Sequence, residues 1–371
     1  MKPNEEGFLF PDVNMDTCAN CGRCEAVCPV LKPPVLPETR YGCFAAYNTN
    51  ESEREIASSG GIFLLIARWI LQRGGVVFGA AFNSDFSVSH TYAEKEEEVY
   101  AFCGSKYVQS RIGNSYGEVR RFLEEGRNVL FTGTPCQIMG LHNYLGKKYH
   151  NLFTADIICH GVPSPAVWNK YVEERSAKDN AGFSPMSIHF RDKATGWSKY
   201  SVCFRYDKSS YRNSHSEDPY MRGFLKNLYL RPSCHNCIAK GIHRMSDFTL
   251  ADFWGIQRIL PDMYDNRGVS LVLLHSSKAF VIWEELQGSI KSVPVDSTAA
   301  INANSAAIRS VECHPKREEF FSRYEKGTLE ELIYELIPKE PPPKITLWQR
   351  IRGKLGRIYR KLKAITGISN E

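Results

Sequence analysis

Four closely spaced cysteines near the start of the chain constrain its chemistry more than any other feature. The run consists of Cys18, Cys21, Cys24 and Cys28, is followed at once by a proline, and spells C-x-x-C-x-x-C-x-x-x-C-P. In bacterial ferredoxins this spacing wraps an iron–sulfur cluster, and in two-cluster proteins the fourth thiolate serves the other cluster. The run predicts a small ferredoxin-like module over residues 1–40 that carries a 4Fe-4S cluster. Structural zinc is the alternative, although zinc sites favour separated pairs or Cys/His mixtures.

The length, cysteine count and net charge of the chain limit the kinds of protein in which such a module can occur. The chain has 371 residues, twelve cysteines and a net charge of +6. It shows no secretion leader and no apolar stretch long enough to span a membrane, so we expect a cytoplasmic protein whose thiols stay reduced or bind metal. Residues 344–371 hold eight basic residues and one acidic residue, which leaves the body close to neutral. This distribution argues against a nucleic-acid-binding body.

Short apolar strands alternate with helical stretches in the first half of the chain, a pattern typical of an α/β body. From about residue 186 the apolar residues alternate as in antiparallel strands. We therefore expect an α/β to α+β fold with an α/β body over 41–185, a second region with C-terminal helices over 186–340, and a tail over 341–371. The expected helices are 62–71, 116–125, 137–145, 165–178 and 278–287, and the expected strands are 76–82, 128–132, 152–158, 187–190, 201–206 and 271–275.

A small-residue turn before the first apolar helix is a candidate ligand site. Ser58-Ser59-Gly60-Gly61 combines serines that can cap a helix with glycines that let a ligand approach the backbone. The bare amides at a helix start attract anions, so the turn predicts a site for a dinucleotide pyrophosphate. A plain capped helix is the alternative. Lys106, in the segment GSKY, is a candidate for holding a phosphate or the electron-rich end of a flavin, with a solvated lysine as the alternative.

Four further cysteines come from three separate segments. Cys136 and Cys159 each follow the end of an expected strand, where ligands bind in α/β proteins, and Cys234 and Cys237 form a C-x-x-C pair in a loop. Together they supply enough thiolates for a second 4Fe-4S cluster. The alternatives are that Cys136 and Cys159 are buried small hydrophobes and that the C-x-x-C pair is a redox dithiol.

One histidine lies beside this cysteine set. His160 follows Cys159 directly and is a candidate for moving protons next to a redox centre, with a packed histidine as the alternative. The remaining cysteines lie in apolar surroundings, and we expect them in the core: Cys43, Cys103, Cys203 and Cys313.

Seven ordered motifs give the chain a family resemblance from about residue 7 to about residue 280. They are SSGGIF, GSKYVQS, LFTGTPCQ, ICHGVPSP, FRDK-x-x-GW, RPSC-x-x-C and SDFTLADFWG. In this order they resemble the coenzyme F-420 hydrogenase/dehydrogenase beta-subunit family. The resemblance implies an FAD-binding iron–sulfur protein that passes electrons between clusters and a hydride carrier, often a deazaflavin coenzyme. Related members reduce chlorophyll intermediates, and others occur among polysaccharide-synthesis proteins.

The resemblance also implies where the cofactors lie. It makes 41–185 a flavin-binding region and supports the second cluster on the four later cysteines. The expected function is an FAD- and 4Fe-4S-dependent oxidoreductase served by a redox partner protein or a hydride-carrying coenzyme. The alternatives are a reductase that acts directly on an organic substrate in polysaccharide biosynthesis and a non-catalytic electron-transfer subunit. The residues expected near FAD are Ser59, Gly60, Gly61, Lys106, Gly133 and Thr134.

The chain departs from the family pattern at its N-terminal module. Family members with a full module carry two of the ferredoxin runs, whereas this sequence carries one. Three ligands of the first cluster are then Cys18, Cys21 and Cys24, and the fourth is either Cys28 after a local rearrangement or Cys43. A three-iron cluster is another interpretation, and so is a chain that lacks its true start and has two ferredoxin clusters.

The tail carries an amphipathic pattern over residues 344–365. Apolar residues recur at steps of three and four, and basic residues fill the other positions. A basic helix with such a face suits a peripheral contact with the inner face of a membrane. A helix docked on the body or on a partner subunit is the alternative. The apolar stripe consists of Trp348, Ile351, Leu355, Ile358, Leu362 and Ile365.

Overall fold

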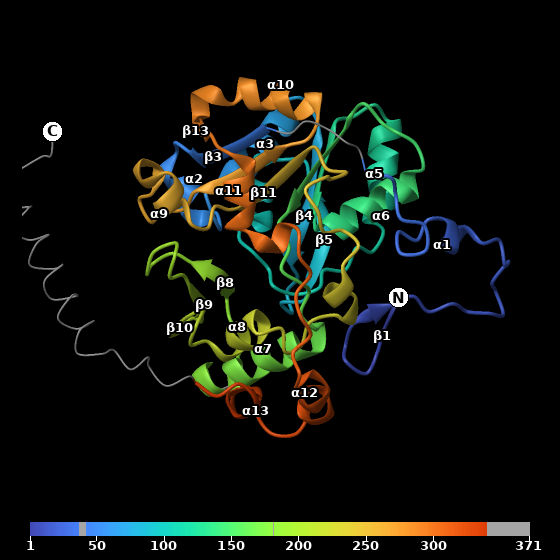
Figure 1. The fold of residues 1–371 in the computed structure, drawn as a ribbon. Helices are drawn as coiled ribbons and strands as arrows, with labels where there is room; N and C mark the ends of the chain where they lie inside the picture. Colours follow the sequence, from blue (N-terminus) through green and yellow to red (C-terminus); the bar gives the residue numbers. More distant parts are fainter. Residues whose placement is uncertain (37–41, 181, 340–371) are drawn as a thin grey trace, which may run out of the picture. The chain divides into compact units, whose positions relative to one another are not determined.

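A mixed eight-stranded sheet forms the centre of the fold (Figure 1). The computed structural model describes residues 1–36, 42–180 and 182–339, and residues 1–336 form one compact unit. The four central strands β11, β7, β6 and β4 are parallel, and antiparallel strands flank them on both sides. In spatial order the strands are β13 (Ile290–Pro294), β3 (Gly42–Asn48), β12 (Ser270–Leu274), β11 (Phe248–Asp252), β7 (Leu152–Ile157), β6 (Val129–Gly133), β4 (Val76–Phe82) and β5 (Val88–Ala93).

Helices cover both faces of this sheet because its strands are apolar on both sides, as expected for parallel strands. Val77 packs in the core formed with α3 (Ile62–Leu71) and α10 (Ser277–Glu285). Its neighbours Val76 and Phe78 point the other way and pack in the core formed with α5 (Ser115–Glu124) and α6 (Pro135–Leu145). The result is a three-layer arrangement.

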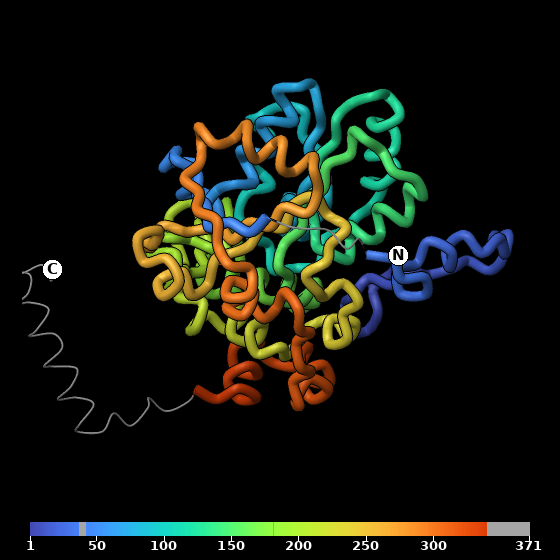
Figure 2. Tube along the Cα trace, turned by 45° about the horizontal axis from the view of Figure 1, so that its top comes forward, coloured from blue at the N-terminus to red at the C-terminus, as the bar shows by residue number. Residues whose placement is uncertain are grey.

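A small antiparallel sheet and several helices lie beside the carboxyl ends of the parallel strands (Figure 1). Figure 2 follows the same chain from another direction. These elements bring β8 next to the large sheet, where it contributes to the candidate site. The sheet contains β8 (Ser187–Asp192), β9 (Ser201–Arg205) and β10 (Ser210–Ser214), and the helices include α7 (Pro165–Asn180), α8 (Pro219–Leu225), α12 (Arg317–Arg323) and α13 (Leu329–Leu336).

The N-terminal residues form an arm that is largely exposed beyond the buried Phe8. A two-stranded hairpin of β1 (Lys2–Pro3) and β2 (Leu9–Phe10) leads into a loop with one short helix, α1 (Arg23–Ala26). The arm reaches α6, where the Asn143 side chain donates a hydrogen bond to the carbonyl of Val27 over 3.2 Å. Figure 2 draws this segment as a blue loop that projects from the rest of the unit.

The expected α/β to α+β fold is confirmed, with one refinement of its organisation. The regions expected on either side of residue 185 share one sheet, since β11, β12 and β13 complete the sheet begun by β3 and β4. In the part of the chain that the structure describes, no helix is both long and apolar enough to span a bilayer. The amphipathic pattern at 344–365 lies outside the described residues.

Candidate functional site

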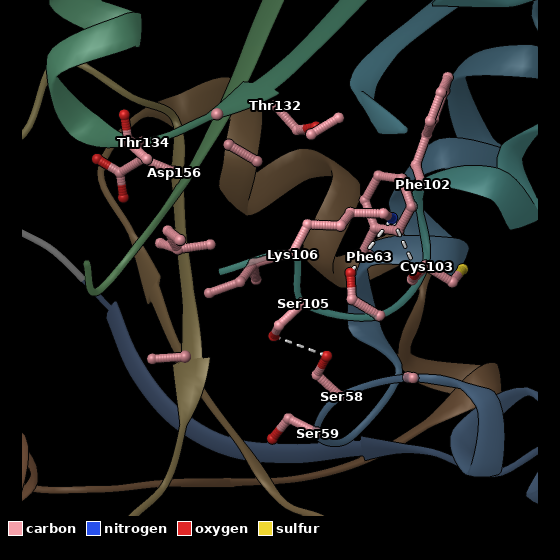
Figure 3. Close-up of a pocket in the computed structure, with 18 of the residues that line it drawn as sticks. Ser58, Ser59, Phe63, Phe102, Cys103, Ser105, Lys106, Thr132, Thr134 and Asp156 are labelled. Atoms are coloured by element: carbon pink, nitrogen blue, oxygen red, sulfur yellow. Dashed lines mark hydrogen bonds between the residues drawn. The ribbon is translucent and has the colours of Figure 1, made fainter. Parts of the chain in front are cut away.

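A cavity of about 340 Å³ opens at the carboxyl ends of β6, β7 and β11 (Figure 3). Its walls come from the loop that precedes α3, the loop that follows a 3-10 turn at Tyr100–Phe102, and the start of α6. The expected cofactor residues that line it are Ser58, Ser59, Gly61, Lys106, Gly133 and Thr134. Gly60 does not line the cavity: its amide donates to the Ser270 hydroxyl over 2.9 Å, and a Cβ atom there would lie 2.5 Å from the carbonyl of Ala46.

The loop Ser58–Gly61 is held from behind by two buried cations of the FRDK motif. Arg191 makes a bidentate ion pair with Asp252 at 2.8 and 2.9 Å and also donates to the carbonyl of Ser58 over 3.1 Å. The Lys193 ammonium donates to three carbonyls, those of Arg54, Ser59 and Arg267, at 2.6, 2.9 and 2.9 Å. Burial lowers the pKa of Lys193 to about 8. The two side chains therefore fix the backbone that forms one wall of the cavity.

Lys106 lies in the cavity wall but directs its charge at its own loop. Its ammonium donates to the carbonyls of Ala101 and Cys103 at 2.8 and 2.9 Å, with the carbonyl of Gly104 at 3.4 Å (Figure 3). Ser105 of the same loop lies with its hydroxyl oxygen 2.9 Å from that of Ser58. Lys106 thus shapes the loop that faces Ser58–Gly61, and its contact with a phosphate or a flavin stays a prediction.

Three polar side chains, those of His90, Ser110 and Gln137, form one hydrogen-bonded network in the cavity wall. His90 Nε2 lies 3.0 Å from the carbonyl of Thr132, so this nitrogen carries the proton, and Nδ1 accepts from the Ser110 hydroxyl over 3.0 Å. Gln137 donates its amide N–H to Ser110 over 2.8 Å and accepts the backbone N–H of Thr134 over 2.9 Å. All these residues line the cavity. The network therefore fixes the polar wall from β5 to the start of α6.

Because His90 is neutral in the folded protein, the free energy of unfolding should depend on pH. Burial lowers its pKa to about 4, whereas an unfolded histidine titrates near pH 6.5. Between these values the unfolded chain binds more protons than the folded one, so the free energy of unfolding falls as the pH is lowered through this window, by up to about 3 kcal/mol from this group. Urea unfolding at several pH values should show a weaker acid dependence for His90→Gln than for wild type. Identical acid dependence in the two proteins would contradict this assignment.

The later cysteines come together next to the cavity. Cys136 lies in the first turn of α6, and Cys159 follows β7, while Cys234 lies in a 3-10 turn at Pro232–Asn236 that Cys237 follows. Burial raises the pKa of Cys159, and negative charge on Cys136, Cys234 and Cys237 raises it further. Burial, with smaller effects from Cys136 and Cys237, raises the pKa of Cys234 to about 11. The four thiols are therefore close enough to influence one another electrostatically.

A 4Fe-4S cluster on these four thiols stays a prediction of the sequence. Among residues 1–36, 42–180 and 182–339, no group of three or more His, Cys, Asp or Glu side chains is arranged to hold one metal ion. A zinc ion would need all its sulfur ligands about 2.3 Å from one point. A 4Fe-4S cube instead binds each thiolate at a separate iron, so its sulfur ligands lie farther apart. Four thiolates from three segments are the ligand set that such a cube uses.

A buried carboxylate joins the cysteine loop to the sheet. Asp156, at 1% exposure, accepts a hydrogen bond from Thr249 over 2.5 Å, and Arg244 lies 3.9 Å from its other oxygen. Arg244 also donates to the carbonyl of Ala239, two residues after Cys237, and to that of Ala307. Burial raises the pKa of Asp156 to about 6. This contact fixes the C-x-x-C loop against β7.

His160 lies beside the cysteines and outside the cavity lining. Its Nε2 is 2.7 Å from the side-chain oxygen of Asn227, and its ring meets the Phe224 ring edge-on at 5.0 Å. Burial lowers its pKa. Phe224 in turn stacks on Tyr107, a cavity residue, at 4.8 Å. A proton-transfer role for His160 stays a prediction that belongs to the cysteine site.

The cysteines of the ferredoxin run are exposed or half-buried in the arm. The chain turns between them at Asn20 and Gly22, both with positive φ, and the amide of Asn20 donates to the Cys18 sulfur over 3.4 Å. Cys43 is buried in β3 within the core of the sheet, so the structure contradicts its proposed role as the fourth ligand of this run. Cys313 is exposed, and the prediction that it lies in the core is wrong.

Comparison with known proteins supports the fold and the family resemblance. Residues 126–298 match the sequence profile for the C-terminal part of the beta subunit of coenzyme F420 hydrogenase/dehydrogenase. The match covers a little less than half of the chain and bears out the resemblance to the coenzyme F420 hydrogenase/dehydrogenase beta-subunit family. A chain of the F420-reducing NiFe hydrogenase complex from Methanosarcina barkeri, solved in xenon-derivatised form, shares the fold with a TM-score of 0.50 and 16% identity, over 79% of this chain and 95% of that one. No curated protein matches the chain.

The match over residues 126–298 supports a redox role with electron transfer for this chain. Sequence reasoning found the turns and cysteines of the site but missed the side chains that support them. Those residues are His90, Ser110, Gln137, Asp156, Arg191, Lys193 and Asp252. Four of the seven motifs contain some of these residues: GSKYVQS ends at Ser110, LFTGTPCQ ends at Gln137, SDFTLADFWG contains Asp252, and FRDK contains Arg191 and Lys193.

Proposed function

We propose that this chain is an FAD- and 4Fe-4S-dependent oxidoreductase that transfers electrons between a cluster and a hydride carrier. The cluster ligands are Cys136, Cys159, Cys234 and Cys237, and FAD occupies the adjacent cavity. One observation carries the proposal, namely the wall that the two sites share. Thr134 lines the cavity, and its hydroxyl oxygen lies 3.1 Å from the Cys136 sulfur. Electrons crossing this wall need no other protein group between the cluster and the cofactor.

The cavity residues suit the flavin part of FAD. A volume of about 340 Å³ lies at the lower end of the range for ligand pockets and suits a ring system better than a whole dinucleotide. The starts of α3 and α6 both face the cavity, and helix starts favour negative charge. Glycine at position 133 avoids a close contact in the cavity wall, since a Cβ atom there would lie 3.0 Å from the Gln137 side-chain oxygen. When bound, FAD supplies the conversion between a hydride and single electrons.

A first cluster on the N-terminal arm extends the electron path to the surface. The ferredoxin run offers thiolates that solvent and a second protein can reach, and the arm contacts the helix whose first turn holds Cys136. Exposed apolar side chains also mark the arm as a surface for a redox partner protein. Those side chains are Val13, Met15, Val27, Val30, Leu31 and Val35. The fold shared with a chain of a multi-subunit hydrogenase agrees with a partner of this kind.

Anaerobic purification followed by cofactor analysis tests the proposal. We expect a brown protein that contains flavin, iron and acid-labile sulfide, because both ligand sets belong to the same folded unit. Absorption spectra before and after addition of a reduced deazaflavin coenzyme should show flavin and cluster reduction together. Zinc in place of iron, or the absence of flavin from the freshly isolated protein, would contradict the proposed function.

A further inference from the structure

The hydroxyl group of Thr134 stands between two acceptors. Its oxygen lies 3.1 Å from the Cys136 sulfur and 3.1 Å from the side-chain oxygen of Gln137. A hydroxyl has one proton to donate, so the two contacts compete for it. The Gln137 oxygen already accepts the backbone N–H of Thr134 over 2.9 Å. When the hydroxyl proton turns to the sulfur, the Gln137 oxygen therefore still accepts one hydrogen bond, from the backbone N–H of Thr134.

The orientation of Gln137 is itself fixed. Its amide nitrogen donates to Ser110 over 2.8 Å, and Ser110 donates to the ring nitrogen of His90 over 3.0 Å. With the amide nitrogen turned to Ser110, the amide oxygen must face Thr134. This chain of donors keeps an acceptor at the backbone amide of Thr134 and leaves its hydroxyl beside Cys136.

The direction of the bond to sulfur follows from chemistry. A cysteine sulfur bound to iron is a thiolate and has no proton, so Thr134 must donate to it. A hydrogen bond to a ligating sulfur stabilises the extra electron of the reduced cluster and so raises its reduction potential. The contact from the backbone amide of Val162 to the Cys234 sulfur is longer, at 3.4 Å.

We propose that Thr134 is a positioning residue whose hydroxyl donates to Cys136 and sets the reduction potential of the cluster at the cavity wall. This inference rests on the proposed function, because it requires a cluster on Cys136. Thr134 also lines the cavity, so one hydroxyl borders both redox groups. Its contribution is to raise the reduction potential of the cluster at the shared wall.

Redox titration followed by electron paramagnetic resonance tests the inference on the full chain, purified anaerobically. The relevant signal is the one that Cys136→Ser removes. We expect Thr134→Val, which keeps the shape of the side chain and removes the hydroxyl, to move the midpoint of this signal to a more negative potential. Thr134→Ser, which keeps the hydroxyl, should stay at the wild-type midpoint. The midpoint of the N-terminal cluster should be the same in all variants.

The outcomes separate this inference from the proposed function. If Thr134→Val carries the cluster at an unchanged midpoint, the inference is overturned and the proposed function stands. If Cys136→Ser loses no signal and no iron, the ligand set is wrong and the inference falls with it. Should valine prevent cluster assembly, Thr134→Ala gives the same comparison, and a midpoint equal to that of Thr134→Ser would overturn the inference.

Discussion

Replacing Cys234 by serine is expected to remove one whole cluster, about four irons per chain, while the N-terminal cluster remains. Cys234 lies half-buried in the turn at Pro232–Asn236, where the amide of Val162 donates to its sulfur. Serine offers iron a much poorer ligand than a thiolate. Loss of a bound cluster also removes its contribution to folding, so the melting temperature should fall. Iron and sulfide analysis together with thermal unfolding measures both effects.

Cys313→Ser provides the matched control for this experiment. Cys313 is an exposed thiol that belongs to neither ligand set, so its substitution should leave iron content and melting temperature at wild-type values. Cys136→Ser should reproduce the iron loss of Cys234→Ser, because the two thiols serve one cluster. Unchanged iron content in both variants would show that Cys136 and Cys234 do not bind a cluster and serve only in packing.

Much of the fold could be predicted because its elements are short and strongly apolar. The helix at 62–71 and the strand at 76–82 have the bounds that their hydrophobic patterns predict. The strand at 271–275 was also expected, but its place beside β3 was not. That pairing joins residues more than 200 positions apart, and no local pattern specifies it. The apparent division near residue 185 was therefore a change of pattern within one sheet.

The same limit applies to the site. Small-residue turns identified Ser58–Gly61 and Gly133–Thr134 because such turns have a local signature, and the structure brings both to one cavity. The role of Lys193 depends on carbonyls at Arg54 and Arg267, which no spacing rule relates to it. The sequence predicts Lys106 as a site residue but does not predict its hydrogen-bond acceptors. These acceptors are backbone carbonyls, and their positions depend on the folded loop.

Replacing Lys193, which holds the loop Ser58–Gly61 from behind, by methionine is expected to weaken flavin binding strongly. At 8% exposure, its ammonium holds three carbonyls, including that of Ser59. Methionine fills similar space but leaves these carbonyls buried without a donor, which should cost about 2–4 kcal/mol of stability. Once released, the loop Ser58–Gly61 should bind FAD at least tenfold more weakly, or about 1.4 kcal/mol. Titration of the flavin-free protein with FAD measures the affinity.

A structural defect and a positioning defect give different results in this test. Lys199→Met changes an exposed lysine six residues further along the chain and should leave both affinity and stability unchanged. Lys193→Arg retains a cation that can donate to several carbonyls, so it should recover part of the affinity. Arg191→Met removes the neighbouring contact to the carbonyl of Ser58 and should weaken FAD binding in the same direction. If Lys193→Met is less stable but binds FAD as tightly as wild type, Lys193 supports the fold without positioning the loop.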